Sequence, residues 1–117
     1  MKPSMSEYRI VASRVFRLSV QRLKGFLSHQ YSTELADKTL LEVQQKIGQA
    51  LPKHPRIAPV SERLLELGVQ HYRQWHIDQH NIVFYRLDES RKVVELLLIM
   101  DTRQSLRKLL FEVNLLS

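Results

Sequence analysis

Apolar residues recur with a helical period in the first part of the chain. Four large apolar side chains follow one another at intervals of three or four residues, which is the spacing of one face of an α-helix. They are Phe16, Val20, Leu23 and Leu27. Ser13 stands just before this stretch and can cap its first turn. The pattern predicts an amphipathic helix over about 14–29.

A second helical stripe follows almost at once. Ser32 and Thr33 are candidate caps, and Glu34 lies in the first turn, where a carboxylate suits the helix dipole. The stripe consists of Leu35, Leu40, Val43, Ile47 and Leu51. Pro52 ends it. Because the link between the two stretches is so short, we expect an αα-hairpin.

The remaining patterns are those of strands. Residues 8–12 alternate between polar and apolar, and 72–77, 82–87 and 93–100 are rich in β-formers and separated by short polar turns. The last run is almost wholly apolar, which is typical of a central strand covered on both faces. Arginines recur along the other strands, so we expect a sheet with a basic face. Two prolines make 53–59 a connector, and a short helical turn closed by Gly68 follows it.

The chain ends in a further amphipathic pattern. Its apolar stripe consists of Leu106, Leu109, Leu110 and Val113. Asp101 and Gln104 have the spacing of a capping box and predict the start of a helix there. Phe111, Leu115 and Leu116 lie off the stripe, so this end either binds a partner or folds back onto the sheet, which we favour. Helices and strands in this order predict an α+β fold within one domain, 1–117.

Composition points to an anionic partner. The 117 residues have a net charge of +6 and no cysteine, so disulfides and cysteine metal sites are excluded. Acids are scarce near the start of the chain, where Glu7 is the single acid among six bases. They are Lys2, Arg9, Arg14, Arg17, Arg22 and Lys24. We found no leader sequence and no apolar run long enough to span a bilayer, so the cytoplasm is the expected compartment.

Few residues suggest catalysis. The chain has no nucleophile motif, and its three glycines form no phosphate-binding loop. The five histidines do not form a recognisable ligand set, so we expect neither a metal nor a cofactor. Arg73, Arg86 and Arg103 flank the predicted strands and are suited to holding phosphate. Tyr72 and Tyr85 lie beside them; they either stack on bases or, as we favour, pack in the sheet.

The order of these elements, with the segments 82–88 and 97–103, resembles the ParE/RelE superfamily of toxins from bacterial type II toxin–antitoxin modules. The resemblance covers about 8–110. It implies a helical hairpin packed on a curved, mostly antiparallel sheet. It also implies an acidic antitoxin that wraps the toxin in a hetero-oligomer.

The two branches of this superfamily differ in their targets. RelE-like members cleave messenger RNA on the ribosome, often with a C-terminal tyrosine or histidine, whereas ParE-like members inhibit DNA gyrase. This chain has no tyrosine after Tyr85 and no histidine after His80, and Met100 occupies the strand end where many relatives have histidine. These features and the two long helices favour the ParE-like branch, which is not enzymatic.

Two alternatives remain open from the sequence. One is a RelE-like endoribonuclease in which Arg73, Arg86 and Arg103 grip the scissile phosphate. The other is an inactive interaction module of the same fold. For the favoured interpretation, the candidate surface for the target or antitoxin combines bases and apolar residues near the C-terminus. It consists of Arg91, Lys92, Arg103, Arg107, Lys108, Leu106, Leu110 and Phe111.

Overall fold

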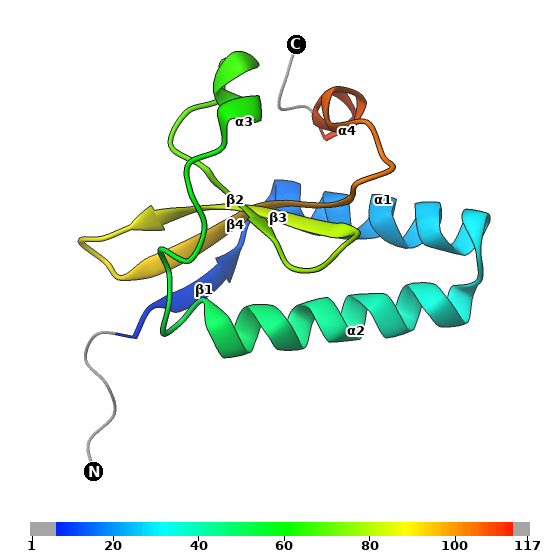
Figure 1. Cartoon of the computed structure of the whole chain (residues 1–117), viewed down its shortest axis with the longest axis horizontal. Coiled ribbons are helices and arrows are strands. Elements are labelled where there is room, and N and C mark those ends of the chain that lie inside the picture. The colour runs from blue at the N-terminus through cyan, green and yellow to red at the C-terminus, as the bar shows by residue number, and fades with distance from the viewer. Residues whose placement is uncertain (1–6, 114–117) are drawn as a thin grey trace.

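The computed structural model describes residues 7–113, in which helices and strands follow the predicted order (Figure 1). The elements are β1 (Arg9–Ala12), α1 (Arg14–Gln30), α2 (Thr33–Ala50), α3 (Glu62–Glu66), β2 (Arg73–His76), β3 (Asn81–Asp88), β4 (Val93–Asp101) and α4 (Leu106–Glu112). The predicted α+β class is confirmed. Leu115 and Leu116 lie outside the described residues.

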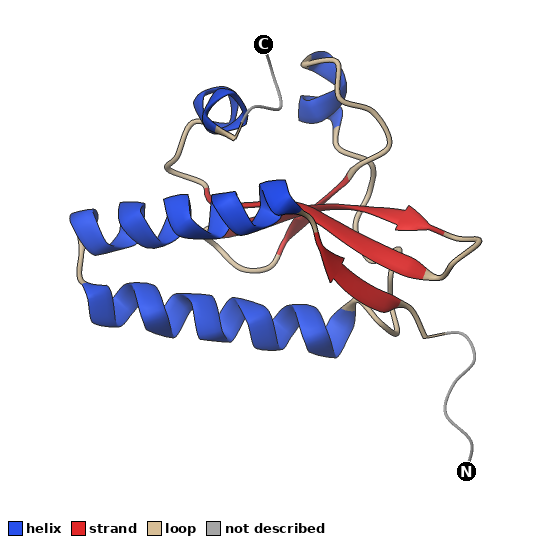
Figure 2. Cartoon of the chain, turned by 180° about the vertical axis from the view of Figure 1, so that it is seen from behind, coloured by secondary structure: helices blue, strands red, loops and turns tan. Residues whose placement is uncertain are grey.

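The four strands, red in Figure 2, form one mixed sheet in which the order is β1-β4-β3-β2. β2, β3 and β4 form the predicted antiparallel meander, and β1 runs parallel to β4. β1 and β2 are therefore the edge strands.

The predicted helical hairpin is present. The hydroxyl of Ser13 accepts a hydrogen bond from the backbone N–H of Phe16 at 3.0 Å, and that of Ser32 accepts one from Leu35, also at 3.0 Å. Each serine satisfies one of the first N–H groups of its helix, as expected of an N-cap. Figures 1 and 2 show α1 and α2 lying antiparallel, with α1 running beside the sheet.

Two hydrophobic cores cover the two faces of the sheet. The first lies between the sheet and the helical hairpin and includes Val83, Tyr85 and Ile99. The second lies under α3 and α4 and includes Phe84 and Met100. The expected basic face of the sheet is therefore wrong, because apolar side chains cover both faces. The arginines lie at strand ends, in turns and on helices.

A bulge in β4 changes which side chains reach each core. Phe84 pairs with Leu98 but Tyr85 pairs with Leu96, so Leu97 has no partner in β3. An unpaired residue of this kind shifts the alternation of side chains by one position. Leu96 accordingly belongs to the first core, whereas Leu97 and Leu98 both belong to the second.

The start of the C-terminal helix differs from the prediction. Ser105, not Asp101, is the N-cap of α4, and its hydroxyl accepts a hydrogen bond from the N–H of Lys108 at 3.2 Å. Gln104 does accept a hydrogen bond from the N–H of Asp101, but the Asp101 carboxylate turns to Arg103 instead of capping a helix. The apolar stripe of α4 packs on the sheet, with Leu109 and Val113 buried, whereas Phe111, which was expected to fold back with the tail, stays exposed. Within 7–113, no helix has both the length and the apolar character that crossing a membrane requires.

Candidate functional site

The three arginines proposed for phosphate binding do not converge on one point. Arg73 pairs with Tyr85 in the sheet, so Arg86, the next residue of β3, points to the opposite face. Arg103 follows Asp101, which pairs with Asn81 at the other end of β3. Arg73 and Arg86 therefore lie on opposite faces of the sheet. Most of β3 separates both of them from Arg103.

Each of the three also has a partner within the chain. The Nη1 group of Arg73 donates to the carbonyl of Ala58 at 2.6 Å. Arg86 forms an ion pair with Glu95, with Nε 2.7 Å from Oε1, and its guanidinium lies 5.9 Å from the ring centre of Tyr72. The Glu95 hydrogen bond, with a smaller opposing effect of desolvation, raises the pKa of Arg86 further above its ordinary value. Arg86 and Arg103 stay solvent-exposed, but neither is an uncompensated charge.

The aromatic residues of the meander are packed. Tyr85 is fully buried, and its hydroxyl donates to the carbonyl of Pro55 at 2.6 Å. Burial raises the pKa of the Tyr85 hydroxyl, and desolvation likewise raises that of the half-buried Tyr72. Trp75 packs against the first core. The packing interpretation is confirmed for Tyr85, and Tyr72 packs against the second core.

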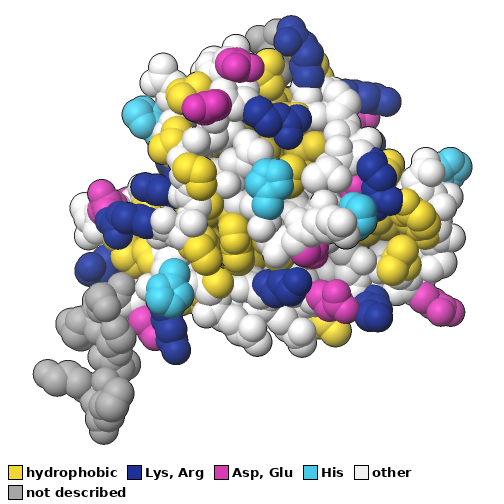
Figure 3. All heavy atoms as spheres, in the orientation of Figure 1, with side chains coloured by type: hydrophobic (Ala, Val, Ile, Leu, Met, Phe, Trp, Pro, Cys, Tyr) yellow, Lys and Arg dark blue, Asp and Glu magenta, His cyan; other side chains and the backbone are white. Residues whose placement is uncertain are grey.

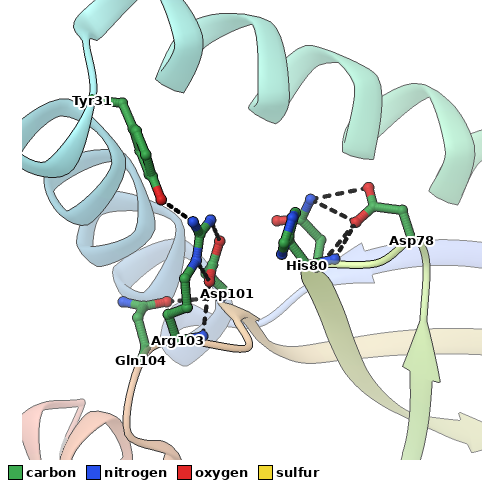
Figure 4. A network of polar contacts seen from close by, with 7 residues as sticks. Tyr31, Asp78, His80, Asp101, Arg103 and Gln104 are labelled. Atoms are coloured by element: carbon green, nitrogen blue, oxygen red, sulfur yellow. Dashed lines mark hydrogen bonds and ion pairs between the residues drawn. The ribbon is translucent and has the colours of Figure 1, made fainter.

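Three turns meet at the end of the sheet near Arg103 and form a strand-end cluster (Figure 4). Tyr31 comes from the turn between α1 and α2, Asp78 and His80 from the turn between β2 and β3, and Arg103 from the turn after β4. The backbone N–H of Thr102 donates to the carbonyl of His80 at 2.7 Å and so joins two of these turns. Arg103 donates to the hydroxyl of Tyr31 and joins the third.

Asp78 organises its own turn within the cluster. Its carboxylate accepts hydrogen bonds from the backbone N–H groups of His80 and Asn81, and from the side-chain amide of Asn81. Burial opposes ionisation of Asp78, but the Asn81 side chain, these two N–H groups and Lys46 together lower its pKa below the ordinary value. The Oδ1 atom of Asn81 is buried without a hydrogen-bond partner among the described residues.

An apolar cleft of about 480 Å³ lies beside the edge strand β1. Its lining comes from β1, from the facing sides of α1 and α2, and from β4. The main lining residues are Ile10, Ala12, Phe16, Val20, Leu40, Val43, Ile47, Leu96 and Ile99. Gly48 also faces this β1 cleft, and a Cβ atom built there meets no other atom within 4 Å.

The free edge of β1 borders this cleft. Arg9 and Ser13 donate their N–H groups to the carbonyls of Lys92 and Leu96, so the alternation of the strand directs the backbone groups of Ile10 and Ala12 away from the sheet. The cleft therefore combines apolar walls with an open strand edge. The sequence reasoning missed this site, although an isolated glycine inside a predicted helix was a signal for it.

A second hollow, of about 490 Å³, lies between α1 and α4. In this α1–α4 groove, Arg22 and Gly25 come from α1, and Arg103, Gln104 and Lys108 come from the turn after β4 and from α4. It contains two of the residues that the sequence suggested for partner binding, Arg103 and Lys108.

The other suggested binding residues are scattered. Leu106 and Leu110 are buried in the second core, so their assignment to a binding surface was wrong: they anchor α4 to the sheet. Phe111 is 46% exposed and remains available. Arg91 and Lys92 lie in the turn between β3 and β4, at the opposite end of the sheet from Arg103. Figure 3 shows basic side chains spread over the visible face, with acidic side chains between several of them.

The chain resembles known proteins in its fold. No family model and no curated protein matches the chain. Among solved structures, the chromosomal ParDE toxin–antitoxin system of P. aeruginosa matches with a TM-score of 0.64 and 13% identity, over 82% of this chain and 97% of that one. The RelBE2 toxin–antitoxin complex of Mycobacterium tuberculosis matches with a TM-score of 0.56 and 14% identity, over 81% of this chain and 98% of that one. The predicted RelE/ParE-like fold is confirmed.

Proposed function

We propose that this chain is the toxin of a type II toxin–antitoxin module, a ParE-like inhibitor of DNA gyrase that its antitoxin neutralises in a hetero-oligomer. The fold shared with proteins of two toxin–antitoxin systems supports this proposal. The β1 cleft is the observation that carries it, because it is an apolar hollow beside an open strand edge.

The β1 cleft suits an apolar segment of the antitoxin. Protein interiors are close-packed, so an apolar hollow that reaches core residues such as Leu96 and Ile99 leaves apolar surface for a partner to cover. The open backbone of Ile10 and Ala12 can pair with an extended chain. Alternate side chains of an added strand would then enter the cleft.

Gly48 offers a sharp test of this docking. Gly48→Phe places a large side chain in open space in the β1 cleft, whereas Gly48→Ala adds only a methyl group. Each variant is co-expressed with the product of the neighbouring reading frame, and the complex is recovered through a tag on the toxin. We expect Gly48→Ala to retain the partner and Gly48→Phe to lose it. Equal recovery with both variants contradicts docking in the cleft.

The arrangement of the arginines supports inhibition by binding rather than by catalysis. Arg73, Arg86 and Arg103 are separated and each has a partner within the chain, so they do not form a joint phosphate site. For contact with the target we propose the exposed bases and the exposed aromatic residue near the strand ends and on α4. They are Arg91, Lys92, Arg107, Lys108 and Phe111.

Induction of the chain in bacteria separates the candidate targets. Gyrase inhibition in the cytoplasm predicts filamentous cells with DNA-damage signalling, and purified protein should stop gyrase from supercoiling a relaxed plasmid. Co-expression of the antitoxin should restore growth. Immediate arrest of translation with cut transcripts contradicts the proposal. Harmless expression without the antitoxin favours the inactive interaction module.

A RelE-like endoribonuclease is the second candidate, and the strand-end cluster is the observation that favours it. The hydrogen bond from the N–H of Thr102 to the carbonyl of His80 brings an imidazole, a common general acid or base, to the end of β4. Primer extension on transcripts after induction tests this activity. His80→Ala and Arg103→Ala should then abolish the cuts. If Arg86→Ala leaves cleavage untouched, Arg86 is excluded from that site.

A further inference from the structure

We propose that the α1–α4 groove is a second docking site, which takes an acidic segment of a partner protein with one apolar anchor residue. The inference rests on the proposed function in so far as the antitoxin is the natural partner. Docking in the β1 cleft needs only apolar contacts and a strand edge, whereas this groove selects a different chemistry.

The charges around the groove set that chemistry. Four cations and no acid lie on α1, namely Arg14, Arg17, Arg22 and Lys24; Arg22 lines the groove, and Lys24 pairs with Asp37 of α2. On α2, by contrast, three acids (Glu34, Asp37 and Glu42) outnumber two bases (Lys38 and Lys46). The positive charge of the hairpin is thus concentrated on the helix that forms one wall of the groove. Negative segments are attracted to such a surface.

Two cations in the groove have no ion-pair partner in the part of the chain that the structure describes. The ion pairs within residues 7–113 engage other bases and leave out Arg22 and Lys108. Both side chains line the groove, one from α1 and one from α4. An acidic segment between the two helices can therefore meet a cation on either side.

The turn after β4 adds oriented donors. A guanidinium has five N–H groups. Arg103 uses three of them, one on Nε and one on Nη2 for Asp101 and one on Nη1 for Tyr31, so two remain. The Oε1 atom of Gln104 accepts from the N–H of Asp101, which leaves the amide NH₂ group free to donate. These donors suit carboxylate oxygens, which accept bidentate hydrogen bonds.

The floor of the groove favours a peptide over a nucleic acid. Phe26 and Leu109 supply apolar surface, and Gly25 has no side chain, so a Cβ atom there meets nothing within 4 Å. An apolar side chain of a peptide fits this space. Glu112 also lines the groove and would repel a phosphodiester backbone, whereas a peptide can place a neutral residue beside it.

The two docking sites lie on different sides of α1. Phe16 and Val20 line the β1 cleft, and Arg22 and Gly25 line the α1–α4 groove. The exposed residues Arg14 and Arg17 lie on the same helix. One partner chain that fills both sites must therefore cross α1. Two linked contacts on one partner strengthen binding, because the first contact raises the effective concentration of the second segment at its own site.

A peptide titration of the full chain tests the groove by itself. The probe is a short synthetic peptide with glutamates around a single leucine, added to ¹⁵N-labelled protein and followed by amide chemical shifts. We expect saturable shifts around Gly25 and Ser105, and none with a peptide in which glutamine replaces every glutamate. The proposal is overturned if the acidic peptide causes no shifts, or if shifts map to another surface. Tighter binding of a single-stranded oligonucleotide at the same residues also overturns it.

Matched variants sharpen the result. Gly25→Trp fills the groove and should weaken peptide binding about tenfold or more, whereas Gly25→Ala should change it less than about twofold. Arg22→Glu should weaken binding, while Lys38→Glu, a charge reversal on the exposed surface of α2, should leave it nearly unchanged. Equal effects of the two charge reversals show that only the net charge matters, and they contradict a built site. Because Gly48→Phe tests the β1 cleft and Gly25→Trp tests this groove, either proposal can fail without the other.

Discussion

Arg103 and Asp101 form a two-pronged ion pair at the end of the sheet. Nε of the arginine lies 2.8 Å from Oδ1 and Nη2 lies 2.6 Å from Oδ2 (Figure 4). The Asp101 side chain is 1% exposed and the Arg103 side chain is 41% exposed. A buried carboxylate thus holds a solvent-facing cation in one orientation, and that cation in turn contacts Tyr31 in the helical hairpin.

Removing Arg103 should destabilise the fold. Arg103→Ala leaves a buried carboxylate without its cation and loses the contact with Tyr31, so we expect a loss of about 1–3 kcal/mol in the free energy of unfolding. Arg103→Lys keeps the charge but cannot make the forked contact, so it should recover only part of this loss. Urea denaturation measures both variants. Full stability of Arg103→Lys would show that the charge alone suffices.

Ser19 joins α1 to the sheet where β1 ends. The fully buried hydroxyl donates to the carbonyl of Phe16 at 2.7 Å and accepts from the N–H of Ile99 at 3.0 Å. β1 pairs with β4 only as far as Leu96, so Ser19 supplies the acceptor that a longer β1 would have supplied.

Replacing Ser19 by alanine should therefore be costly. Ser19→Ala leaves the buried N–H of Ile99 without an acceptor, and we expect the free energy of unfolding to fall by about 1–3 kcal/mol. Thermal unfolding followed by circular dichroism measures the change. Ser28→Ala on the same helix is the control, because no side-chain hydrogen bond of Ser28 is present among the described residues. Similar effects of the two substitutions would contradict the bridging role of Ser19.

Local patterns explain why most of the fold was predictable. The apolar stripe from Phe16 to Leu27 and the cap residue Ser13 are signals contained within a few turns of chain, and the helix forms where they predict it. The bulge at Leu97 left no such signal. A strand buried on both faces has no alternation of polar and apolar residues, so a shift of one position is invisible in its sequence.

Long-range contacts explain what was missed at the candidate sites. The sequence singled out Arg103, but its neighbours Tyr31 and His80 come from turns far away in the sequence. Leu106 and Leu110 were assigned to a surface because periodicity tells which side chains share a helix face, not which face meets the core. The β1 cleft depends on how four elements (β1, α1, α2 and β4) pack together, which no local pattern records.

The three glycines should respond differently to alanine. Gly25 and Gly48 lie inside helices, with open space where an added methyl group would lie, so Gly25→Ala and Gly48→Ala should each raise stability by about 0.5–1 kcal/mol. Gly68 has φ of +81°, a conformation that strains residues with a side chain, so Gly68→Ala should lower stability by a similar amount. Denaturant unfolding of the three variants checks the pattern. A loss of stability in either helix variant would contradict the open space described there.

Acid should weaken the turn between β2 and β3 through Asp78. The folded state lowers the pKa of this carboxyl below its ordinary value of 3.8, so its ionised form stabilises the fold at neutral pH. A depressed folded pKa gives a contribution that is complete above the unfolded pKa and is lost as the pH falls through the folded pKa. Asp78→Asn should therefore cost about 1–2 kcal/mol at pH 7, through weaker hydrogen bonds to His80 and Asn81, and the difference from the parent should shrink below about pH 4. Urea denaturation across this pH range measures this difference in the free energy of unfolding.

Asp88 is the control for Asp78. The pKa of Asp88 is also lowered, first by the Ser90 hydroxyl, but Asp88 lies in the exposed turn between β3 and β4. A pH-independent difference between Asp78→Asn and the parent would contradict the role of the charge.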